Sequence, residues 1–546
     1  MASGSSTNDI TFIVPGQAQG AAPAATTRGT VKAAVRVGTE RGGGEPVRVT
    51  ARPGRDVVVL EIANGPTLVL HPAAARDLML AQSASVTRSA LAGTRSKSGP
   101  SEILVPAQLG WPGLEAEATR GTTRGWLGQA LLTGFQVLTG DALDPAAKLA
   151  AAAITKKVDA QVDAGVYRLS ADALAPLKGS GAKLDAVPAA ADGGPLLVFV
   201  HGTFTETVGT FGKLWTLHGA TVRQLFSSYD DRVYALDHPT LGTSPIGNAL
   251  TLVRALPAGA RIHLVTHSRG GLVVEAFARA CAGGNAIGDE ALALFAGDDY
   301  EQHRSDLRAL VKEAQKKGIR CERVVRVGCP ARGTLLASKR LDAYLSILTW
   351  CLGLASIPVA AEVVDFLHEV ARRRAEPAEL PGLEAMTPES PVITWLNHAA
   401  ETIPGELRVV AGDMEGDSIG SWVKTLLSDA FYWTDNDLVV QTRSMYGGAP
   451  RAKTAAGSGA RFLLDKGGKV SHFNYFSNER TVQAIASALL TTARPTSRRS
   501  GRCRGPARTR VERAPPSRSR ARAVPTAPPQ AIGRRCSSSP GSSART

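Results

Sequence analysis

The sequence predicts an α/β protein built on a mainly parallel sheet with helices on both faces, and three observations lead to this prediction. Strand-like and helical runs alternate from residue 195 onward. The first strand-like run, LLVFV at 196–200, is continuously apolar, which is typical of a parallel strand buried on both faces. Another run, at 262–265, turns sharply at 266–271 (THSRGG) and continues as a helix with one apolar stripe. Strands that alternate with helices in this way imply three layers.

The part of the chain before this sheet is expected to contain three segments. Residues 1–27 are small and polar, and we expect them to be disordered. Residues 28–110 are expected to form a β-rich module, because apolar, β-branched runs alternate there with turns that contain Gly and Pro. Residues 111–190 are rich in Ala and are expected to form a helical connector that ends in a linker. The strands expected in the module lie at 31–37, 47–51, 57–62 and 67–70, with a hairpin turn at 64–66.

Residues 191–493 are expected to form the main α/β domain. Its strands are expected at 196–200, 232–237, 262–265, 323–328, 407–413 and 460–464. Its helices are expected at 211–229, 244–256, directly after 266–271 and at 479–490, with a long helical insertion at about 341–397.

One stretch of that insertion, 343–361, carries no charge over 19 residues. A membrane-spanning helix needs about 20 apolar residues. Ser, Thr, Gly and Pro358 dilute this stretch, so we expect a buried or lid-like pair of helices, with membrane contact as the alternative role.

The charge distribution argues against a nucleic-acid-binding body. The chain has a formal charge of +15, but residues 494–546 contain 14 Arg and a single acid, Glu512. This tail therefore holds +13 of the total and leaves +2 for the rest of the chain. A tail rich in Arg, Ser and Pro cannot bury a core, so we expect it to be disordered, and we expect no specific nucleic-acid binding.

Cysteine usage favours a reducing compartment. The six cysteines include neither a C-x-x-C pair nor a metal-ligand spacing. Residues 1–9 have neither the basic region nor the apolar core of a secretory signal. We therefore expect a cytoplasmic protein without a metal.

The serine at the apex of the 266–271 turn, Ser268, is the expected nucleophile. A strand, a tight turn and a helix with a serine at the apex form a nucleophile elbow, although Thr266 replaces the first glycine of G-x-S-x-G. A serine hydroxyl is a weak nucleophile at neutral pH, so it needs a base and an acid that orients the base. On an α/β sheet these follow in the order Ser, Asp or Glu, His. His472, between the last strand and the last helix, is the expected base.

Chain order leaves more than one candidate for the acid. Asp437 is preferred because it lies in a loop after the 407–413 strand and directly precedes an apolar run. Asp435 and Asp413 are the alternatives, since loop aspartates also serve turns and helix caps.

The oxyanion of the transition state needs two backbone N–H donors. One donor should be the residue after the nucleophile, Arg269. The other should come from the loop after the first strand, where Thr203 is preferred and Phe204 is second. His201 is expected to be structural, and His267 to point away from Ser268 by strand alternation.

Four segments carry a resemblance to a known family. They are LLVFVHG at 196–202, THSRGG at 266–271, VGCPARGT at 327–334 and AMTPESPVITWLN at 385–397, and DLVV at 437–440 adds a weaker match. With them, the region from about 195 to 490 resembles the α/β-hydrolase superfamily in its lipase- and esterase-like branch. The resemblance implies a three-layer α/β-hydrolase fold with a helical lid, and ester hydrolysis through an acyl-enzyme without a cofactor or metal.

The expected function is that of a serine hydrolase that cleaves a carboxylic ester of a small molecule or lipid, with a hydrophobic acyl group. An amidase, a peptidase or an acyltransferase would use the same acyl-enzyme, so the motif leaves these alternatives open. A non-catalytic interaction scaffold is the alternative from another class. The 28–110 module has no catalytic residue types and is the candidate contact for a protein partner.

Overall fold

The computed structural model describes most of the residues between 9 and 490. The described residues are 9–20, 30–38, 45–63, 65–87, 102–110, 129–139, 155–283, 288–334, 341–354, 356–359, 361–373, 380–398, 402–413, 437, 439–440, 442–452, 459–466 and 470–490. The tail at 494–546, for which the sequence predicts disorder, lies outside them.

The largest of the sheets has eight strands in the order β11-β10-β13-β12-β14-β15-β16-β17. The strands from β13 to β17 in this order are all parallel, whereas β10 is antiparallel to β13 and β11 to β10. The strands are β10 Gly165–Arg168, β11 Lys183–Leu184, β12 Leu196–Val200, β13 Val233–Asp237, β14 Arg261–His267, β15 Arg320–Val327, β16 Glu406–Asp413 and β17 Ala460–Lys466. The main sheet therefore begins before residue 191, because β10 and β11 extend its edge.

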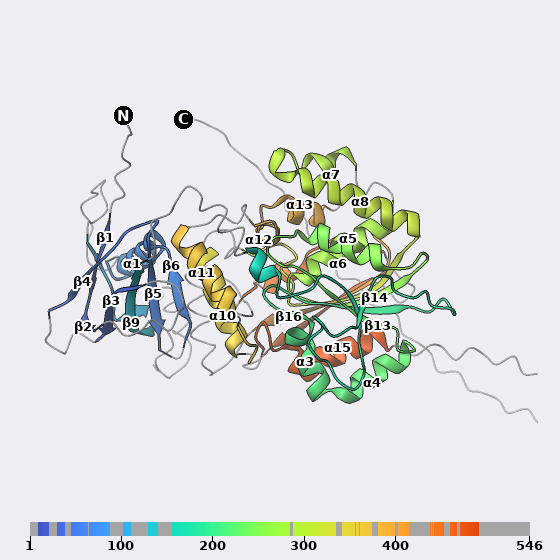
Figure 1. Cartoon of the computed structure of the whole chain (residues 1–546), viewed down its shortest axis with the longest axis horizontal. Helices are drawn as coiled ribbons and strands as arrows, with labels where there is room; N and C mark the ends of the chain where they lie inside the picture. The colour runs from blue at the N-terminus through green and yellow to red at the C-terminus, as the bar shows by residue number, and fades with distance from the viewer. Residues whose placement is uncertain are drawn as a thin grey trace, which may run out of the picture. The chain divides into compact units, whose positions relative to one another are not determined.

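Helices cover both faces of this sheet and complete three layers (Figure 1). One face carries α3 Thr207–Leu217, α4 Gly219–Ser228 and α15 Glu479–Leu489, and the other carries α5 Pro245–Ala255, α6 Gly270–Ala282 and α8 Glu301–Lys317. Two hydrophobic cores flank the sheet, and strand β12 contributes side chains to each of them. Leu196 and Val198 belong to one core, and Leu197 and Phe199 belong to the other. A strand buried on both faces explains the continuous apolar run at this position.

The first part of the chain folds into two smaller β-sheets. One has the order β4-β1-β7, and the other has the order β2-β3-β9-β5-β6, with β8 paired to β9. The elements are β1 Ile10–Val14, β2 Gly16–Gln19, β3 Thr30–Val37, β4 Val47–Ala51, β5 Asp56–Ile62, β6 Thr67–Leu70, α1 Pro72–Thr87, β7 Glu102–Leu104, β8 Gln108–Gly110 and β9 Gln129–Thr139. The expected hairpin is present as the antiparallel β5–β6 pair, although Asn64 of its turn lies outside the described residues.

Two expectations for this part of the chain are wrong. Residues 10–19, expected to be disordered, form β1 and β2, because Ile10, Phe12 and Val14 alternate inward as a half-buried strand requires. The 111–190 stretch, expected to be a helical connector, contains the 11-residue strand β9. Strand β9 forms because β3 and β5, distant in sequence, pair with its two sides.

The described residues of the insertion form four helices, of which the first two pack together and against β6. They are α10 Leu341–Leu354, α11 Ala361–Arg373, α12 Pro381–Glu384 and α13 Pro391–Asn397. No helix in the described part of the chain has the length and apolarity needed to cross a membrane. The uncharged 343–361 stretch instead supplies the apolar side chains of α10, among them Leu345, Leu348 and Leu352, which are buried.

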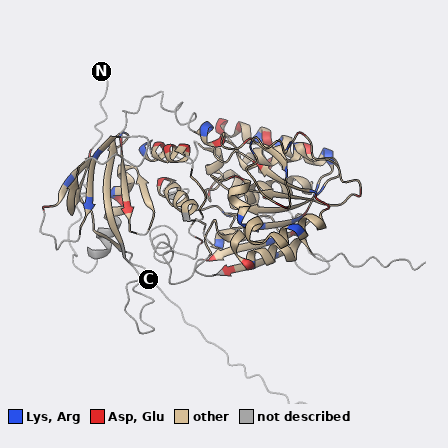
Figure 2. Cartoon of the chain, turned by 60° about the horizontal axis from the view of Figure 1, so that its bottom comes forward, with Lys and Arg blue, Asp and Glu red and all other residues tan. Residues whose placement is uncertain are grey.

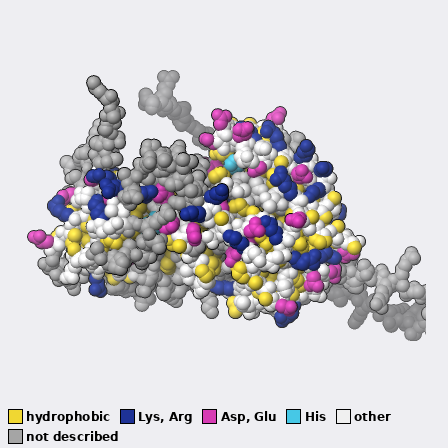
Figure 3. Space-filling view, in the orientation of Figure 1, with side chains coloured by type: hydrophobic (Ala, Val, Ile, Leu, Met, Phe, Trp, Pro, Cys, Tyr) yellow, Lys and Arg dark blue, Asp and Glu magenta, His cyan; other side chains and the backbone are white. Residues whose placement is uncertain are grey.

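Charges of both signs are mixed on the faces that the figures show. The helices and loops drawn in Figure 2 carry Lys and Arg beside Asp and Glu. The face drawn in Figure 3 likewise shows both signs interspersed with apolar side chains. This mixture matches the near balance of charge outside the 494–546 tail.

Candidate active site

Ser268 lies at the tip of the turn that joins β14 to α6. Its φ of 51° falls in the left-handed region, where a residue with a Cβ is under backbone strain. The amide of Ser268 donates to the carbonyl of Val327, on the neighbouring strand β15, at 2.9 Å. This bond fixes the strained residue to the sheet at the carboxyl ends of β14 and β15.

Glycines allow the backbone to pass close to Ser268. A Cβ on Gly202, in the loop after β12, would lie 2.8 Å from the Cβ of Ser268. A Cβ on Gly270, in the first turn of α6, would lie 2.4 Å from the carbonyl oxygen of His201. Real side chains do not tolerate such distances, so both positions need glycine. The loop after β12 and the start of α6 therefore pack directly around the serine.

His472 reaches Ser268 from the loop that follows β17. Its Nε2 lies 2.8 Å from the Oγ of Ser268, and the two residues are 0% and 2% exposed. The backbone N–H of His472 also donates to the carbonyl of Asp437 at 3.0 Å. The imidazole is thus held at the serine by its backbone as well as by its ring.

Asp437 contacts the other nitrogen of the same ring. The Nδ1 of His472 lies 2.8 Å from the Oδ2 of Asp437. The other carboxylate oxygen, Oδ1, accepts hydrogen bonds from the amides of Val439 at 3.1 Å and Val440 at 2.8 Å. These contacts fix the carboxylate, and they assign Nδ1 of the ring as the protonated nitrogen and Nε2 as the acceptor of the serine proton.

The structure describes only one of the two alternative acids. Asp413 is the last residue of β16 and is buried beside β17, where it lies opposite Lys466 in the register. Asp435 lies outside the described residues. The carboxylate that the structure places at His472 is that of Asp437.

The environment of Asp437 favours its ionised form. Burial alone would raise the pKa of this carboxyl, but the neighbouring His472, the Tyr475 hydroxyl and the Val440 amide outweigh that effect, and the pKa lies below its ordinary value. The hydroxyl of Tyr475 donates to Oδ2 at 2.7 Å. Burial, followed by the proximity of Asp437, raises the pKa of Tyr475 far above the ordinary value, so the phenol remains a proton donor.

The residues expected to bind an oxyanion lie beside Ser268. Strands β12 and β14 are parallel neighbours, with Val200 opposite Thr266, so the loops that follow them meet at one edge of the sheet. The Phe204 amide donates to the Oγ1 of Thr240 at 3.4 Å. Within the described residues no hydrogen bond engages the Thr203 amide. This difference favours Thr203 over Phe204 as the donor from this loop.

The side chain of Arg269 has a role that sequence reasoning did not identify. It is fully buried, its Nε donates to the carbonyl of Gly382 at 3.0 Å, and its Nη2 donates to the carbonyl of Thr243. The guanidinium thus ties the residue after the serine to α12 of the insertion. An arginine inside an otherwise small-residue turn was the available signal.

Two further histidine rings, those of His201 and His267, have structural contacts. His201 donates from Nδ1 to the Gly202 carbonyl at 2.9 Å and accepts the His238 amide at Nε2, 3.1 Å away. His267 donates from Nε2 to the carbonyl of His472 at 2.6 Å. Burial, followed by the proximity of His472, lowers the pKa of His267 to about 3, so this ring stays neutral and acts as a support for the His472 loop.

A buried ion-pair network lies on the α6 side of the sheet. The carboxylate oxygens Oε1 and Oε2 of Glu275, on α6, accept hydrogen bonds from Nη1 and Nη2 of Arg451, each at 2.9 Å. Oε2 also lies 3.1 Å from the Nη1 of Arg326. Arg326 also donates to the carbonyls of Met445 and Gly447. The network therefore joins α6 and β15 to the chain that follows Asp437. Its signal in the sequence is a single acid within an apolar helical stripe.

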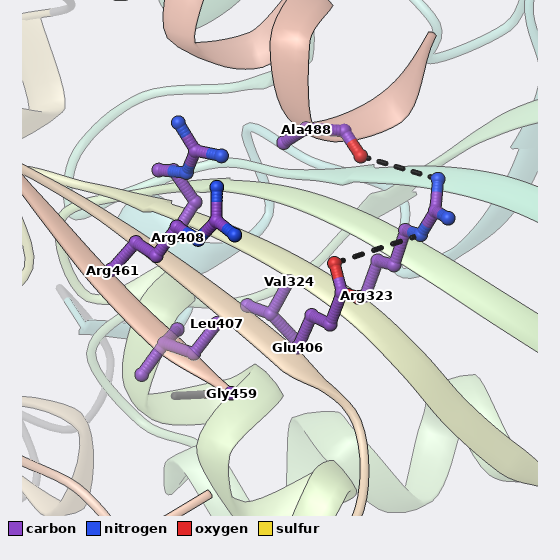
Figure 4. A pocket seen from close by; sticks show the side chains of 8 residues that line it. All are labelled: Arg323, Val324, Glu406, Leu407, Arg408, Gly459, Arg461 and Ala488. Atoms are coloured by element: carbon purple, nitrogen blue, oxygen red, sulfur yellow. Dashed lines mark hydrogen bonds and ion pairs between the residues drawn. The ribbon is translucent and has the colours of Figure 1, made fainter. Parts of the chain in front are cut away.

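Among the described residues, no group of three or more His, Cys, Asp and Glu side chains is placed to hold a metal ion. A small cavity of about 20 Å³ lies at the opposite edge of the sheet and is lined by Arg323, Glu406, Arg408 and Arg461, among others (Figure 4). It lies at the starts of β15, β16 and β17, whereas Ser268 follows the end of β14.

The fold and the site define an α/β protein with a buried serine, histidine and aspartate at the carboxyl edge of its parallel sheet. The family described as "Domain of unknown function (DUF7379)" matches residues 166–288 and 306–490. These two segments make up more than half of the chain, so the protein belongs to this family. The match begins within β10, which agrees with the start of the main sheet.

Three solved lipase structures are similar to the chain. The mature lipase of Bacillus licheniformis is 18% identical, with 56% of this chain and 96% of that chain covered and a TM-score of 0.28. The Staphylococcus hyicus lipase is 15% identical, with 56% and 98% covered and a TM-score of 0.35. Lipase 1 from Pelosinus fermentans is 14% identical, with 55% and 99% covered and a TM-score of 0.34. Comparison with curated proteins finds no match.

Proposed function

We propose that the protein is a serine hydrolase that cleaves carboxylic esters through an acyl-enzyme. The observation that carries this proposal is the unbroken chain of contacts from Ser268 Oγ to His472 Nε2 and from His472 Nδ1 to Asp437 Oδ2, each 2.8 Å long and shielded from solvent. A buried serine with a neutral imidazole acceptor and an ionised carboxylate behind it is arranged for nucleophilic attack.

In the proposed reaction, Ser268 Oγ attacks the ester carbonyl carbon while its proton passes to His472 Nε2. The charge that develops on the imidazole is stabilised by Asp437, and the charge on the substrate oxygen by the amides of Thr203 and Arg269. The imidazolium then protonates the leaving alkoxide, and an acyl-serine remains. Water attacks the acyl-serine with His472 as general base, which releases the acid and restores the serine.

An apolar acyl group is the preferred substrate portion in this proposal. Support comes from the side chains near the oxyanion loop: the Oγ1 of Thr203 lies 3.7 Å from the Sδ of Met386, and the Phe204 ring meets the Phe366 ring edge-on at 5.9 Å. Met386 follows α12 and Phe366 belongs to α11. We propose that this part of the insertion covers the acyl side of the site as a lid.

The test is a rate comparison on p-nitrophenyl esters of rising acyl length, with the matching thioesters and anilides in parallel. Wild type should hydrolyse the esters, and Ser268→Ala and His472→Gln should each lose about three or more orders of magnitude in kcat. His218→Gln is the matched histidine control, since His218 lies between α3 and α4 and its ring lies near the Ser477 carbonyl and Glu479. Full activity in Ser268→Ala would rule out the proposal, and faster anilide or thioester cleavage would reassign the substrate class.

A further inference from the structure

The loop that joins β13 to α5, residues 238–244, contacts the chain on both sides of the proposed oxyanion site. On one side, the amide of Phe204, in the loop after β12, donates to the Oγ1 of Thr240 at 3.4 Å. On the other side, the Nη2 of Arg269 donates to the carbonyl of Thr243. A displacement of the 238–244 loop would therefore reach both segments that supply the proposed amide donors.

The same loop is hydrogen-bonded to the insertion. The amide of Gly382, in α12, donates to the carbonyl of Leu241 at 2.8 Å, and the carbonyl of Gly382 accepts from the Nε of Arg269 at 3.0 Å. A Cβ on Gly382 would lie 2.1 Å from the carbonyl oxygen of Thr240, so this close approach needs glycine. The loop, α12 and Arg269 thus form a closed set of contacts beside Ser268.

A single carboxylate, that of Asp159, binds three consecutive amides of this loop. Its Oδ1 accepts from Thr240 at 2.9 Å and from Leu241 at 3.0 Å, and its Oδ2 accepts from Gly242 at 2.7 Å. A Cβ on Gly242 would lie 2.9 Å from Oδ2, so the glycine allows the loop to close on the carboxylate. Asp159 lies in a helical turn before β10, 81 residues before Thr240 in the chain.

The conformation of the loop depends on these three bonds. Thr240 and Leu241 are buried. Hydrogen bonds to a carboxylate are about twice as strong as those between neutral groups, and a buried amide that loses its acceptor is costly. Without the carboxylate, the loop would shift towards other acceptors. Thr240 would move with it, and so would the β12 loop that is bonded to Thr240.

We propose that Asp159 is a positioning residue for oxyanion binding. Its carboxylate fixes the 238–244 loop, and this loop holds the two segments whose amides, those of Thr203 and Arg269, stabilise the charge on the substrate oxygen. Donors that are already in place stabilise a transition state better than donors that must rearrange, so a displaced loop slows the reaction. This role rests on the proposed ester hydrolysis and adds a residue that precedes the matched family segments, which begin at residue 166.

The first test is steady-state hydrolysis of p-nitrophenyl acetate by the full-length wild type, Asp159→Ala and Asp163→Ala. Asp159→Ala should lower kcat by about tenfold to a hundredfold, because loss of one oxyanion donor costs about 10²–10³ and here the donors are displaced, not removed. KM should stay within about twofold of wild type, since the oxyanion forms only in the transition state. Asp163→Ala is the matched control, because its carboxylate is on the same segment but pairs with Lys183 at the surface, at 2.6 Å.

A second measurement separates positioning from a general loss of packing. A trifluoromethyl ketone forms a hemiketal oxyanion on the catalytic serine, so its inhibition constant should rise in Asp159→Ala by the same factor by which kcat falls. An inhibition constant equal to that of wild type would overturn the proposed role. Thermal unfolding of each variant shows whether it is folded at the assay temperature.

A third variant tests the route through the loop. Thr240→Val removes the hydroxyl that accepts the Phe204 amide and should lower kcat several-fold. Because Asp159 and Thr240 act through one loop, the double variant should lose less than the product of the two single losses. Losses that multiply exactly would mean that Asp159 does not act through Thr240, and would overturn the proposal.

Failure of this role and failure of the proposed hydrolysis give different results. Activity that survives in Ser268→Ala would rule out the hydrolysis itself. Activity that requires Ser268, but has the wild-type kcat in Asp159→Ala, would overturn the positioning role alone. If Asp159→Ala does not fold, Thr240→Val decides, and a kcat unchanged from wild type in that variant would overturn the role.

Discussion

The hydroxyl of Tyr475 lies 2.7 Å from the Oδ2 of Asp437, the same oxygen that contacts His472. The carboxylate therefore accepts hydrogen bonds from a phenol, an imidazole and two backbone amides. Each of these bonds favours the charged form, which is the form that stabilises an imidazolium. Tyr475 thus acts on the serine through Asp437 and is a positioning residue.

Tyr475→Phe should lower kcat on a short-chain ester by about tenfold, since it removes one charge-assisted hydrogen bond. Loss of that bond also raises the pKa of Asp437, so the acid limb of the kcat/KM profile should move to higher pH. Tyr229→Phe is the matched control, because Tyr229 is equally buried and its hydroxyl lies 2.5 Å from His263, away from the serine. If Tyr475→Phe and Tyr229→Phe have the same kcat and the same pH profile of kcat/KM, Tyr475 does not act on the serine through Asp437.

Glu275→Gln should destabilise the protein by about 3–5 kcal/mol at pH 7, because Arg326 and Arg451 are left buried without their carboxylate. Burial opposes ionisation of Glu275, but the charges of Arg451 and Arg326 lower its pKa from 4.5 to about 2. A carboxyl with a lowered native pKa contributes stability that is complete above pH 4.5 and is lost as the pH falls towards 2.

Urea unfolding of wild type and Glu275→Gln across this pH range is the measurement. The difference in unfolding free energy between the two proteins should shrink as the pH falls. Glu322→Gln is the control, because Glu322 pairs with Arg261 at the surface and is 28% exposed, so its loss should cost under about 1 kcal/mol. A difference that does not change with pH would mean that Glu275 is not ionised in the native state.

Gly270→Ala should reduce both stability and activity, because the new Cβ meets the backbone oxygens of His201 and Val200 at 2.4 and 2.5 Å. Relief of that clash moves α6 away from the loop that carries Thr203, at a cost of about 1–3 kcal/mol. Gly212→Ala in α3 is the control, since its Cβ would lie 3.9 Å from Val208 and alanine favours a helix. The measurements are the thermal unfolding temperature and the rate of ester hydrolysis of both variants. If Gly270→Ala equals Gly212→Ala in both measurements, α6 can shift freely and the prediction is wrong.

Phe366→Ala should raise KM for an octanoyl ester several-fold and leave an acetyl ester within about twofold of wild type, because the Phe366 ring covers Phe204 on the proposed acyl side. Phe295→Ala is the control for lost packing, since Phe295 is fully buried beside Tyr300 and His303. Equal effects of Phe366→Ala on the two esters would contradict the proposed lid.

The parallel strands could be predicted from the sequence because each is a short apolar run that its neighbours bury on both faces. The run at 196–200 coincides with β12, and the 407–413 run differs from β16 by one residue. Strand β9 could not be predicted in the same way. Its pairing with β3 and β5 depends on partners about 70 to 110 residues away, which no local sequence pattern indicates.

Part of the candidate site could also be predicted, because local patterns in the sequence indicate it. Chain order and the elbow pattern pointed to Ser268 and His472, which the structure brings within 2.8 Å. Order alone could not choose among the aspartates, because that choice depends on how the loop after β16 folds. The supporting contacts of Tyr475 and of Glu275 depend on packing between distant segments, so sequence reasoning missed both.

The most direct test of the central claim, an activated serine at the elbow, is labelling of the folded protein with a fluorophosphonate followed by peptide mass spectrometry. We predict one phosphonyl adduct on Ser268, no adduct in Ser268→Ala, and much slower labelling in His472→Gln, with His218→Gln as fast as wild type. Labelling of Ser268→Ala at the wild-type rate, or no labelling of wild type with or without detergent, would contradict it.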